Sequence, residues 1–358
     1  MATAVSTSVA ILYALSFGAS VLQVLYLPLL STYAAEIGLR TYEIGLIAGL
    51  GAIVYTITSP FSGSISSRLG ERRAIALALL LLAVSYASML LARNFALLAL
   101  LAGLSLASYA IFWPAVEAGI AYYGGVPSTF SASWSGGTLV GAILASPVLE
   151  APRALAFLSA ASLSAALSIL SAFMRDSPRA VSTVGLLEIV EGVRRLHREW
   201  RLSFAYASSL GSILAFYPLL IDSYGLPAWF TSLTFFSMVG ARTLVFLVYD
   251  KLPEWARRRS IGIVLLSTAF TLPFLKREFT VTAVSSLTGF GQGILYSTSL
   301  KRALSSRDES RVYTGLFEGS IGLGYAVGPA AAGLVASYSL LYAIPTATLI
   351  SVIVAVIP

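Results

Sequence analysis

Near the start of the chain, residues 8–33 read SVAILYALSFGASVLQVLYLPLLSTY, and no charged side chain interrupts them. An α-helix needs about 20 consecutive apolar residues to cross the hydrocarbon of a bilayer. A strand of a transmembrane barrel needs only about 10 residues of alternating polarity, and this run is longer and does not alternate. The segment is therefore predicted to be a transmembrane helix.

Eleven further apolar runs follow it, separated by short breaks. They cover residues 42–66, 74–92, 95–122, 128–149, 154–173, 202–222, 228–249, 261–275, 279–304, 312–337 and 340–357. The composition agrees, because 57% of the residues are hydrophobic and only 11% are charged, whereas a water-soluble domain carries about 25% charged residues. We predict an all-α integral membrane protein with twelve transmembrane helices.

Residues that the chain lacks exclude several classes of function. It has no cysteine and a single histidine, which excludes thiol chemistry, disulfides and clustered metal ligands. It also has no Gly-x-x-x-x-Gly-Lys-Ser/Thr phosphate loop and no paired Asp-x-x-x-Asp motif of the prenyl transferase kind. We therefore expect no enzyme activity, no catalytic residue, no cofactor and no metal site.

The distribution of Lys and Arg predicts the orientation, because cytoplasmic loops carry an excess of these residues. Most of the 23 Lys and Arg residues fall in gaps on one side of the predicted helices, and the other side has only Arg40, Arg93, Arg153, Lys276 and Arg277. Both termini of a multi-pass protein of the cell membrane are thus expected in the cytoplasm. The first eight residues carry no Lys or Arg, unlike a signal peptide, so the first helix is expected to be retained.

The longest gap separates the sixth and seventh helices and spans residues 175–201. Within it, apolar side chains recur at helical spacing, at Leu187, Val190, Val193, Leu196 and Trp200. The arginines of the segment fall on other faces, so we expect an amphipathic helix lying on the inner leaflet. This linker divides the chain into two six-helix halves, residues 1–174 and 202–358.

The two halves repeat each other. The sequence YLPLL at residues 26–30 has a counterpart, FYPLL, at residues 216–220. At nearly one offset along the chain, Arg72-Arg73 recurs as Arg258-Arg259, Gly103 as Gly289, and the pair Gly137 and Gly141 as Gly324 and Gly328. Parallel repeats related by an axis along the membrane normal are a known transporter plan, with the substrate site near mid-membrane between them. The repeat therefore predicts two pseudo-symmetric six-helix bundles and favours transport.

The turn after the second helix reads GSISSRLGERR at residues 63–73. Here the chain resembles the major facilitator superfamily, whose signature at this place is Gly-x-Leu-x-Asp-Arg-x-Gly-Arg-Lys/Arg. Gly63, Arg68, Gly70 and Arg72 match the signature, and Arg73 extends its basic run. The resemblance implies a gating and anchoring motif, in which glycines let helices meet closely while arginines reach lipid phosphates or helix C-termini. A generic positive-inside turn is the plainer alternative.

Two positions of this turn depart from the family pattern. Ser67 stands where the family has an acidic residue that helps to hold the two halves together in one state, and Glu71 stands where a basic residue is usual. The contact between the halves is therefore expected to differ or to be weaker here.

Small residues recur in the fifth and eleventh helices, as Gly137-x-x-x-Gly141 and as Gly324-x-x-x-Gly328 followed by Pro329. This spacing permits close helix packing in lipid. The resemblance places both helices at the interface between the halves, where they must slide, and ordinary helix packing is the alternative. Ala142 stands where the family's exchanger motif has proline, which argues against antiport.

Three ionisable residues lie inside predicted helices, where a charge is costly unless it is paired or hydrated. They are Arg242 in the eighth helix, Glu117 in the fourth and Glu318 in the eleventh. We expect Arg242 to pair with Glu318, functionally or as a structural salt bridge; a pair with Glu117 would cross the halves and could act as a gate. Glu117 could instead reach the inner interface. Desolvated carboxylates hold protons more readily, as a proton-coupled carrier requires.

Polar and aromatic residues near mid-membrane are further candidates for substrate binding. The family lines its cavity with helices 1, 4, 7 and 10, which here carry Gln23, Tyr26, Trp113, Tyr217, Gln292 and Tyr296. Most aromatic residues in membrane helices only pack or mark interfaces, which is the alternative for each of them. We expect Asp222, at the outer end of the seventh helix, and His197, in the linker, to be solvated.

Together these features predict a secondary carrier of a small solute that works by alternating access, with protons as candidate coupling ions. A membrane sensor on the same scaffold and a lipid-handling protein with a cavity open to the bilayer are the alternatives. The expected partners are a small-molecule substrate and membrane lipids. The net charge of +7 follows from the positive loops, so no nucleic acid is expected, and the protein is expected to be a monomer. The substrate, its direction and its coupling stay open.

Overall fold

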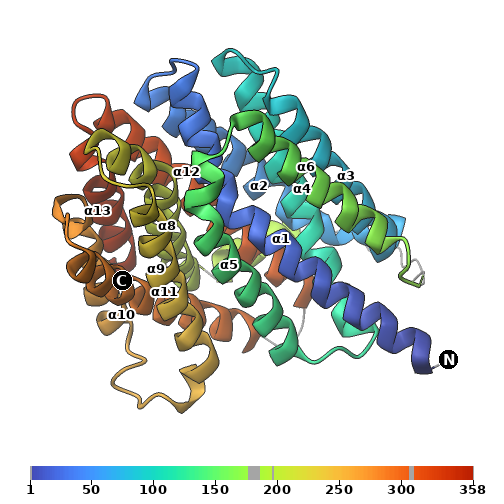
Figure 1. Ribbon diagram of the computed structural model, residues 1–358. Helices are drawn as coiled ribbons and strands as arrows, with labels where there is room; N and C mark the ends of the chain where they lie inside the picture. The colour runs from blue at the N-terminus through green and yellow to red at the C-terminus, as the bar shows by residue number, and fades with distance from the viewer. Residues whose placement is uncertain (1, 176–185, 196, 306–309, 358) are drawn as a thin grey trace.

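The first half of the chain forms six helices. The computed structural model describes residues 2–175, 186–195, 197–305 and 310–357, and these residues contain no strand. The helices of the first half are α1 (Ala2–Glu36), α2 (Thr41–Leu69), α3 (Glu71–Met89), α4 (Phe95–Tyr122), α5 (Pro127–Glu150) and α6 (Arg153–Ser171). Figure 1 shows them on one side of the molecule, with α1 and α5 toward the other half.

The second half follows the same plan after a short helix, α7 (Leu186–Arg195). Its helices are α8 (His197–Ser223), α9 (Trp229–Val248), α10 (Arg259–Ser267), α11 (Glu278–Ser305), α12 (Ser310–Ala336) and α13 (Ala343–Val356). Three short 3-10 segments flank them, namely η1 (Tyr249–Lys251) after α9, η2 (Thr268–Phe274) after α10 and η3 (Leu340–Tyr342) before α13.

The described residues contain nine helices that are long and apolar enough to cross a membrane. Two shorter apolar segments, Arg259–Phe274 and Leu340–Val356, match the ninth and twelfth predicted spans. With α11 they make up the predicted twelve, so α8 to α13 are the seventh to twelfth spans of the sequence prediction. The chain is an all-α, multi-pass membrane protein.

Local sequence explains where individual helices begin and end. At the start of α4, the side chain of Asn94 accepts a hydrogen bond from the backbone nitrogen of Leu97 (2.9 Å), which satisfies one of the free donors of the first turn. Between α2 and α3 a single residue, Gly70, reverses the chain with a φ of 84°. Only glycine adopts this backbone conformation without strain.

Within each half, helices pack through glycines at equivalent positions. In the first half α5 packs on α1, and a β-carbon at Gly137 would overlap the carbonyl oxygen of Phe17. In the second half α12 packs on α8, and a β-carbon at Gly324 would overlap the carbonyl oxygen of Phe204. The same close approach in both halves confirms the predicted pseudo-symmetry. The packing alternative for these glycines is the one observed, because they face their own half and not the other.

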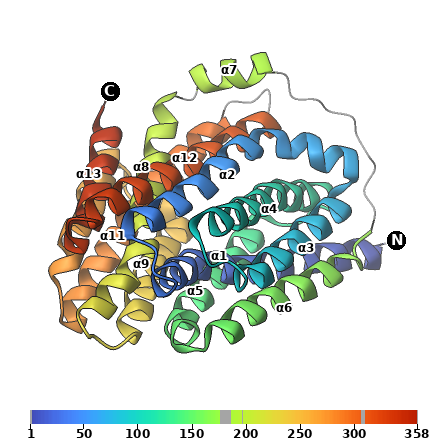
Figure 2. The same ribbon diagram turned by 90° about the horizontal axis from the view of Figure 1, so that it is seen from above.

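Three helix pairs make most of the contact between the halves: α2 with α12, α5 with α9, and α1 with α8. The pair α2 and α12 lies side by side over most of its length (Figure 2). It does so through a separate set of glycines, because β-carbons at Gly45 and Gly315 would crowd the carbonyl oxygens of Pro329 and Ser59. The fifth and eleventh predicted spans, α5 and α12, therefore do border the interface, but not through the glycine pairs singled out in the sequence.

The pair α5 and α9 is held at both ends. At one end the backbone nitrogen of Ser146 donates to the hydroxyl of Ser232 (2.8 Å). Toward the other end the ring of Trp134 lies 5.5 Å from the ring of Phe246.

Part of the predicted surface helix lies within the described residues. It is α7, which contacts α12 and lies beyond it in Figure 2. Leu187, Val190 and Val193 of its apolar face are exposed (86%, 49% and 37%), as a helix on a membrane surface requires. Leu196, together with residues 176–185 of the linker, lies outside the described residues, and Trp200 belongs to α8. The side chain of His197 is likewise outside the described part.

Candidate functional site

A cavity of about 140 Å³ lies between the two halves. It is lined by Gln23, Tyr26, Leu27, Ala48, Ala52, Tyr55, Leu106, Tyr109, Trp113, Glu117, Phe130, Trp134, Tyr206, Leu214, Tyr296, Glu318, Ile321, Gly322 and Tyr325. These residues come from the middle of α1, α2 and α8, the second half of α4, the start of α5, the second half of α11 and the first half of α12. Successive spans run in opposite directions, so the cavity extends from mid-bundle toward the face at which α4 ends and α12 begins.

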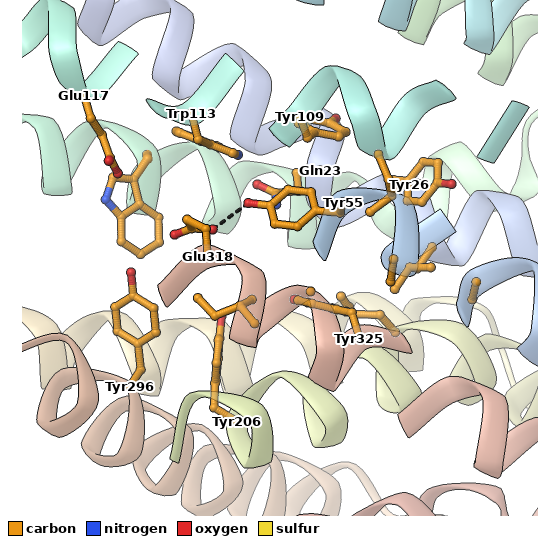
Figure 3. Close-up of a pocket in the computed structure, with 18 of the residues that line it drawn as sticks. Gln23, Tyr26, Tyr55, Tyr109, Trp113, Glu117, Tyr206, Tyr296, Glu318 and Tyr325 are labelled. Atoms are coloured by element: carbon orange, nitrogen blue, oxygen red, sulfur yellow. Dashed lines mark hydrogen bonds between the residues drawn. The ribbon is translucent and has the colours of Figure 1, made fainter. Parts of the chain in front are cut away.

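Six of the nine predicted candidates line this cavity. They are Gln23, Tyr26, Trp113, Glu117, Tyr296 and Glu318, and they come from both halves of the chain (Figure 3). The hydroxyl of Tyr26 also donates to the backbone oxygen of Ala102 (3.4 Å), which fixes its ring against α4.

Two carboxylates, Glu117 of α4 and Glu318 of α12, enter the cavity from opposite halves. Tyr55 of α2 donates its hydroxyl to Oε2 of Glu318 at 2.5 Å, and Figure 3 shows this bond crossing the cavity. The bond therefore joins the halves at the level of the cavity. Among the described residues, no hydrogen bond to Glu117 is formed, and Figure 3 shows its carboxylate directed toward the side of the cavity that carries Tyr296.

Arg242 does not take the position expected from the sequence. It lies on α9, is only 3% exposed and does not line the cavity. Its Nη1 donates to the hydroxyl of Tyr206 (2.9 Å), and its guanidinium lies over the rings of Tyr206 and Phe246 (5.7 and 5.8 Å from the centroids). Within the described part of the chain, Arg242 forms an ion pair with neither Glu318 nor Glu117. The predicted Arg242–Glu318 ion pair is thus wrong, because the guanidinium of Arg242 donates its hydrogen bond to Tyr206 instead of to Glu318.

Two other candidates also lie outside the cavity. Tyr217 of α8 and Gln292 of α11 are both fully buried inside the second half. Nε2 of Gln292 lies 3.5 Å from the sulfur of Met238, on α9. The helices were predicted as cavity helices, but these two side chains point into the packing of their own half.

The sequence analysis missed most of the aromatic lining. Tyr55, Tyr109, Trp134, Tyr206 and Tyr325 were not candidates, yet all line the cavity. Tyr206 packs edge-on against Tyr296, with ring centroids 5.3 Å apart. The available signal was the presence of tyrosine or tryptophan near the middle of a predicted span or in its inner half.

The basic turn between α2 and α3 lies away from the cavity. Nη1 of Arg72 donates to the backbone oxygen of Ala172 (3.5 Å), the residue that caps the C-terminus of α6. An arginine at that place complements the negative end of the helix dipole. Arg68 and Arg73 are exposed. A β-carbon at Gly63 would meet nothing within 4 Å, so the expected close approach of two helices at Gly63 is absent from the described structure.

Ser67, which replaces the acidic residue of the family pattern, is 5% exposed and donates to the backbone oxygen of Ser64 (3.0 Å). Its side chain is thus engaged within its own helix. No group of three or more His, Cys, Asp or Glu residues that could hold a metal ion occurs among the described residues.

Comparison with known proteins places this architecture. The sequence pattern of the Major Facilitator Superfamily matches residues 9–301. No curated protein sequence matches the chain. Among solved structures, the chain is similar to a mutant of the nucleoside transporter NupG, with a TM-score of 0.80, 17% identity and coverage of 97% of this chain and 98% of that chain.

Two further solved structures share the fold. One is a bacterial homolog of the human lysosomal transporter Spinster in an inward-facing, unoccupied conformation, with a TM-score of 0.69, 14% identity and coverage of 98% and 94%. The other is the human organic anion transporter MFSD10, with a TM-score of 0.64, 18% identity and coverage of 98% and 99%. At identities this low, the likeness establishes a shared fold and does not indicate a shared substrate.

The family pattern extends over well more than half of the sequence, and the solved structures are covered almost to their full length. Twelve spans in two six-helix bundles, with a cavity between them, agree with this fold. The chain is a member of the Major Facilitator Superfamily of membrane transporters.

Proposed function

We propose that the protein is a secondary carrier of the cell membrane that moves a small solute by alternating access and couples this movement to protons. The observation that carries the proposal is the cavity itself, into which Glu117 and Glu318 project from opposite halves. A site built from both halves is reshaped whenever the halves move relative to each other, which is what alternating access requires.

In this proposal, residues 1–174 and 202–358 move as two bodies joined by the linker 175–201. Membrane orientation follows from the positive loops, so both termini and the face at which α4 ends are cytoplasmic. The cavity then extends from mid-membrane toward the cytoplasm. The Tyr55–Glu318 hydrogen bond crosses between the two bodies, so it is one contact that the state of the cavity can control.

The charges of the cavity give protons their proposed role. A carboxylate in a poorly hydrated site is costly unless a positive charge or a proton joins it. Glu117 and Glu318 share one cavity, whose lining contains no Lys, Arg or His among the described residues. Uptake and release of a proton at these carboxylates would link the charge of the site to the position of the two halves.

Flux measured on purified protein in liposomes tests the proposal. A panel of labelled solutes is followed with and without an imposed pH gradient, in the wild type, in Glu318→Gln and Arg242→Ala, and in the control Asp250→Asn, which alters an exposed ion pair outside the cavity lining. We expect gradient-driven flux that Glu318→Gln abolishes and the control retains. Flux that is equal in all four proteins and independent of the gradient would make the protein a facilitator and contradict the proton coupling.

A membrane sensor on the same scaffold is the second candidate. It is favoured by Ser67, whose short side chain bonds within its own helix where an acidic residue would be free to contact the other half. A sensor would bind a solute without moving it. Saturable binding in detergent, together with no flux of the same solute in liposomes, would support the sensor and overturn the carrier.

A further inference from the structure

We propose that the cavity recognises an organic cation, meaning a compound with an aromatic or apolar body that carries a protonated or quaternary amine. The inference deepens the proposed function, since it assigns a substrate class to the same cavity. It is carried by the charges of the lining, by its aromatic rings and by the unequal bonding of its two carboxylates.

The lining supplies negative charge and no compensating cation. Its two ionisable acids are Glu117 and Glu318, and the described lining holds no Lys, Arg or His. Arg242 is not part of the lining, and its Nη1 donates a hydrogen bond to the hydroxyl of Tyr206, which is. An anionic solute would bring a third negative charge to the two carboxylates, and a neutral solute would leave both without a counter-charge. A cationic solute supplies what the cavity lacks.

The walls of the cavity suit the same ligand. About half of the lining residues are Tyr, Trp or Phe, and the face of an aromatic ring attracts a cation placed over it. Trp113 and Tyr296 flank the carboxylates in Figure 3, and Tyr206 packs edge-on against Tyr296. Acids set among several rings form an arrangement that binds the charge and the apolar body of an amine together.

The two carboxylates have different parts in this site. Oε2 of Glu318 already accepts the hydroxyl of Tyr55 at 2.5 Å. No hydrogen bond to Glu117 is formed within the described residues, and its carboxylate points into the cavity (Figure 3). The ammonium group is therefore assigned to Glu117 first, with Glu318 as the more distant counter-charge.

A set of three probes of nearly the same shape tests the assignment. Tritiated 1-methyl-4-phenylpyridinium is a permanent cation, 4-phenylpyridine is neutral at pH 8, and 4-phenylbenzoate is an anion. Binding of the cation to purified protein is measured at pH 8 by scintillation proximity, with the other two as competitors. We expect the cation to bind about ten-fold or more tightly than either relative.

Variants then locate the counter-charge. Glu117→Gln should weaken binding of the cation by about ten-fold or more, while binding of the neutral probe should change by less than about two-fold. Glu318→Gln should weaken binding of the cation by less than Glu117→Gln does, and the exposed control Asp250→Asn should leave that binding unchanged. Thermal unfolding of each variant checks that it is folded. If Glu117→Gln does not fold, Glu117→Asp keeps the charge, and its preference for the cation over the neutral probe should persist.

The outcomes separate this inference from the proposed function. Equal or tighter binding of the anion or the neutral probe by the wild type would overturn the cation assignment, as would unchanged cation binding in folded Glu117→Gln. Neither result touches transport, which is measured as flux in liposomes. Conversely, tight binding of the cation without flux of any solute would support the cation assignment and overturn the carrier.

Discussion

The two halves of the molecule share their packing but not their chemistry. In the first half Gly137 of α5 lies on the backbone of α1 at Phe17, and in the second half Gly324 of α12 lies on the backbone of α8 at Phe204. At the cavity the halves diverge, because the first half contributes Glu117 without a hydrogen bond among the described residues and the second contributes Glu318 bound by Tyr55. A duplicated scaffold has thus kept the contacts that allow two helices to approach and has varied the side chains that face the space between the halves.

The largest effect expected concerns the shared packing. Gly137→Ala and Gly324→Ala each put a methyl group onto a backbone carbonyl of the neighbouring helix, and backbone cannot turn aside as a side chain can. We expect each to lower the free energy of unfolding by about 3 kcal/mol, at the upper end of what overpacking costs. Thermal unfolding in detergent and monodispersity on a sizing column measure this.

Gly136→Ala is the matched control, because the nearest atoms to a β-carbon at Gly136 are ring carbons of Phe17 at 3.5 and 3.6 Å, an ordinary contact. It should unfold close to the wild type. If Gly137→Ala were harmful and Gly324→Ala harmless, the equivalence of the two packings would be wrong.

The second prediction concerns the difference between the two carboxylates. Tyr55→Phe removes the hydroxyl that donates to Glu318, leaving a half-buried acid without that donor, and should lower the free energy of unfolding by about 1–3 kcal/mol. Glu117→Gln removes no hydrogen bond and takes away a charge near Glu318, so stability should stay the same or rise. Differential scanning fluorimetry of both variants in one detergent compares them. A larger loss in Glu117→Gln than in Tyr55→Phe would show that the unequal bonding has been assigned to the wrong acid.

The fold was predictable from the sequence because its determinants are local or periodic. Long apolar runs, Lys and Arg on one side and glycines at one repeated offset are each visible without a structure. Even the short ninth and twelfth spans were expected, and they appear as Arg259–Phe274 and Leu340–Val356.

The candidate site was only partly predictable, because it depends on which face each helix turns to the other half. It depends on depth along the helix as well: Tyr206 and Tyr217 lie about three turns apart on nearly the same face of α8, yet the first lines the cavity and the second is fully buried outside its lining. Tyr55 was missed because α2 was treated only through its C-terminal turn. The predicted partner of Arg242 was wrong because its guanidinium forms a hydrogen bond with Tyr206 and not an ion pair with Glu318. Spacing along the chain does not show such a contact.

A third, smaller effect sharpens the role of Arg242, which has no counterpart in the first half. Arg242→Met removes a buried cation that holds no carboxylate among the described residues, so no charge is stranded and stability should change by about 1 kcal/mol or less. Flux should fall several-fold, because Tyr206 loses the donor that fixes it beside the cavity. Flux in Tyr206→Phe should fall as far, and flux in the double variant should fall no further, since both substitutions break the same hydrogen bond. Fully additive losses in the double variant would mean that Arg242 acts on the cavity by another route.

The smallest effects are expected at the surface, where each half carries an exposed ion pair. In the first half Arg153 meets both carboxylate oxygens of Glu36 through Nε at 2.8 Å, and the Arg153 side chain is 20% exposed. In the second half Lys301 meets Asp250 at 2.6 Å, with side chains 60% and 78% exposed. The fork of an arginine holds a carboxylate in a fixed geometry, whereas a solvated lysine pair gains little and is screened by salt.

Glu36→Gln should therefore lower the free energy of unfolding by about 0.5–1 kcal/mol, and Asp250→Asn should leave the melting temperature unchanged. Thermal unfolding in detergent, at low and at high salt, measures both variants. The loss in Glu36→Gln should shrink at high salt, because the remaining exposure of the pair admits screening ions. An equal loss in Asp250→Asn would mean that geometry and burial do not distinguish the pairs. The difference between the halves would then be confined to the cavity.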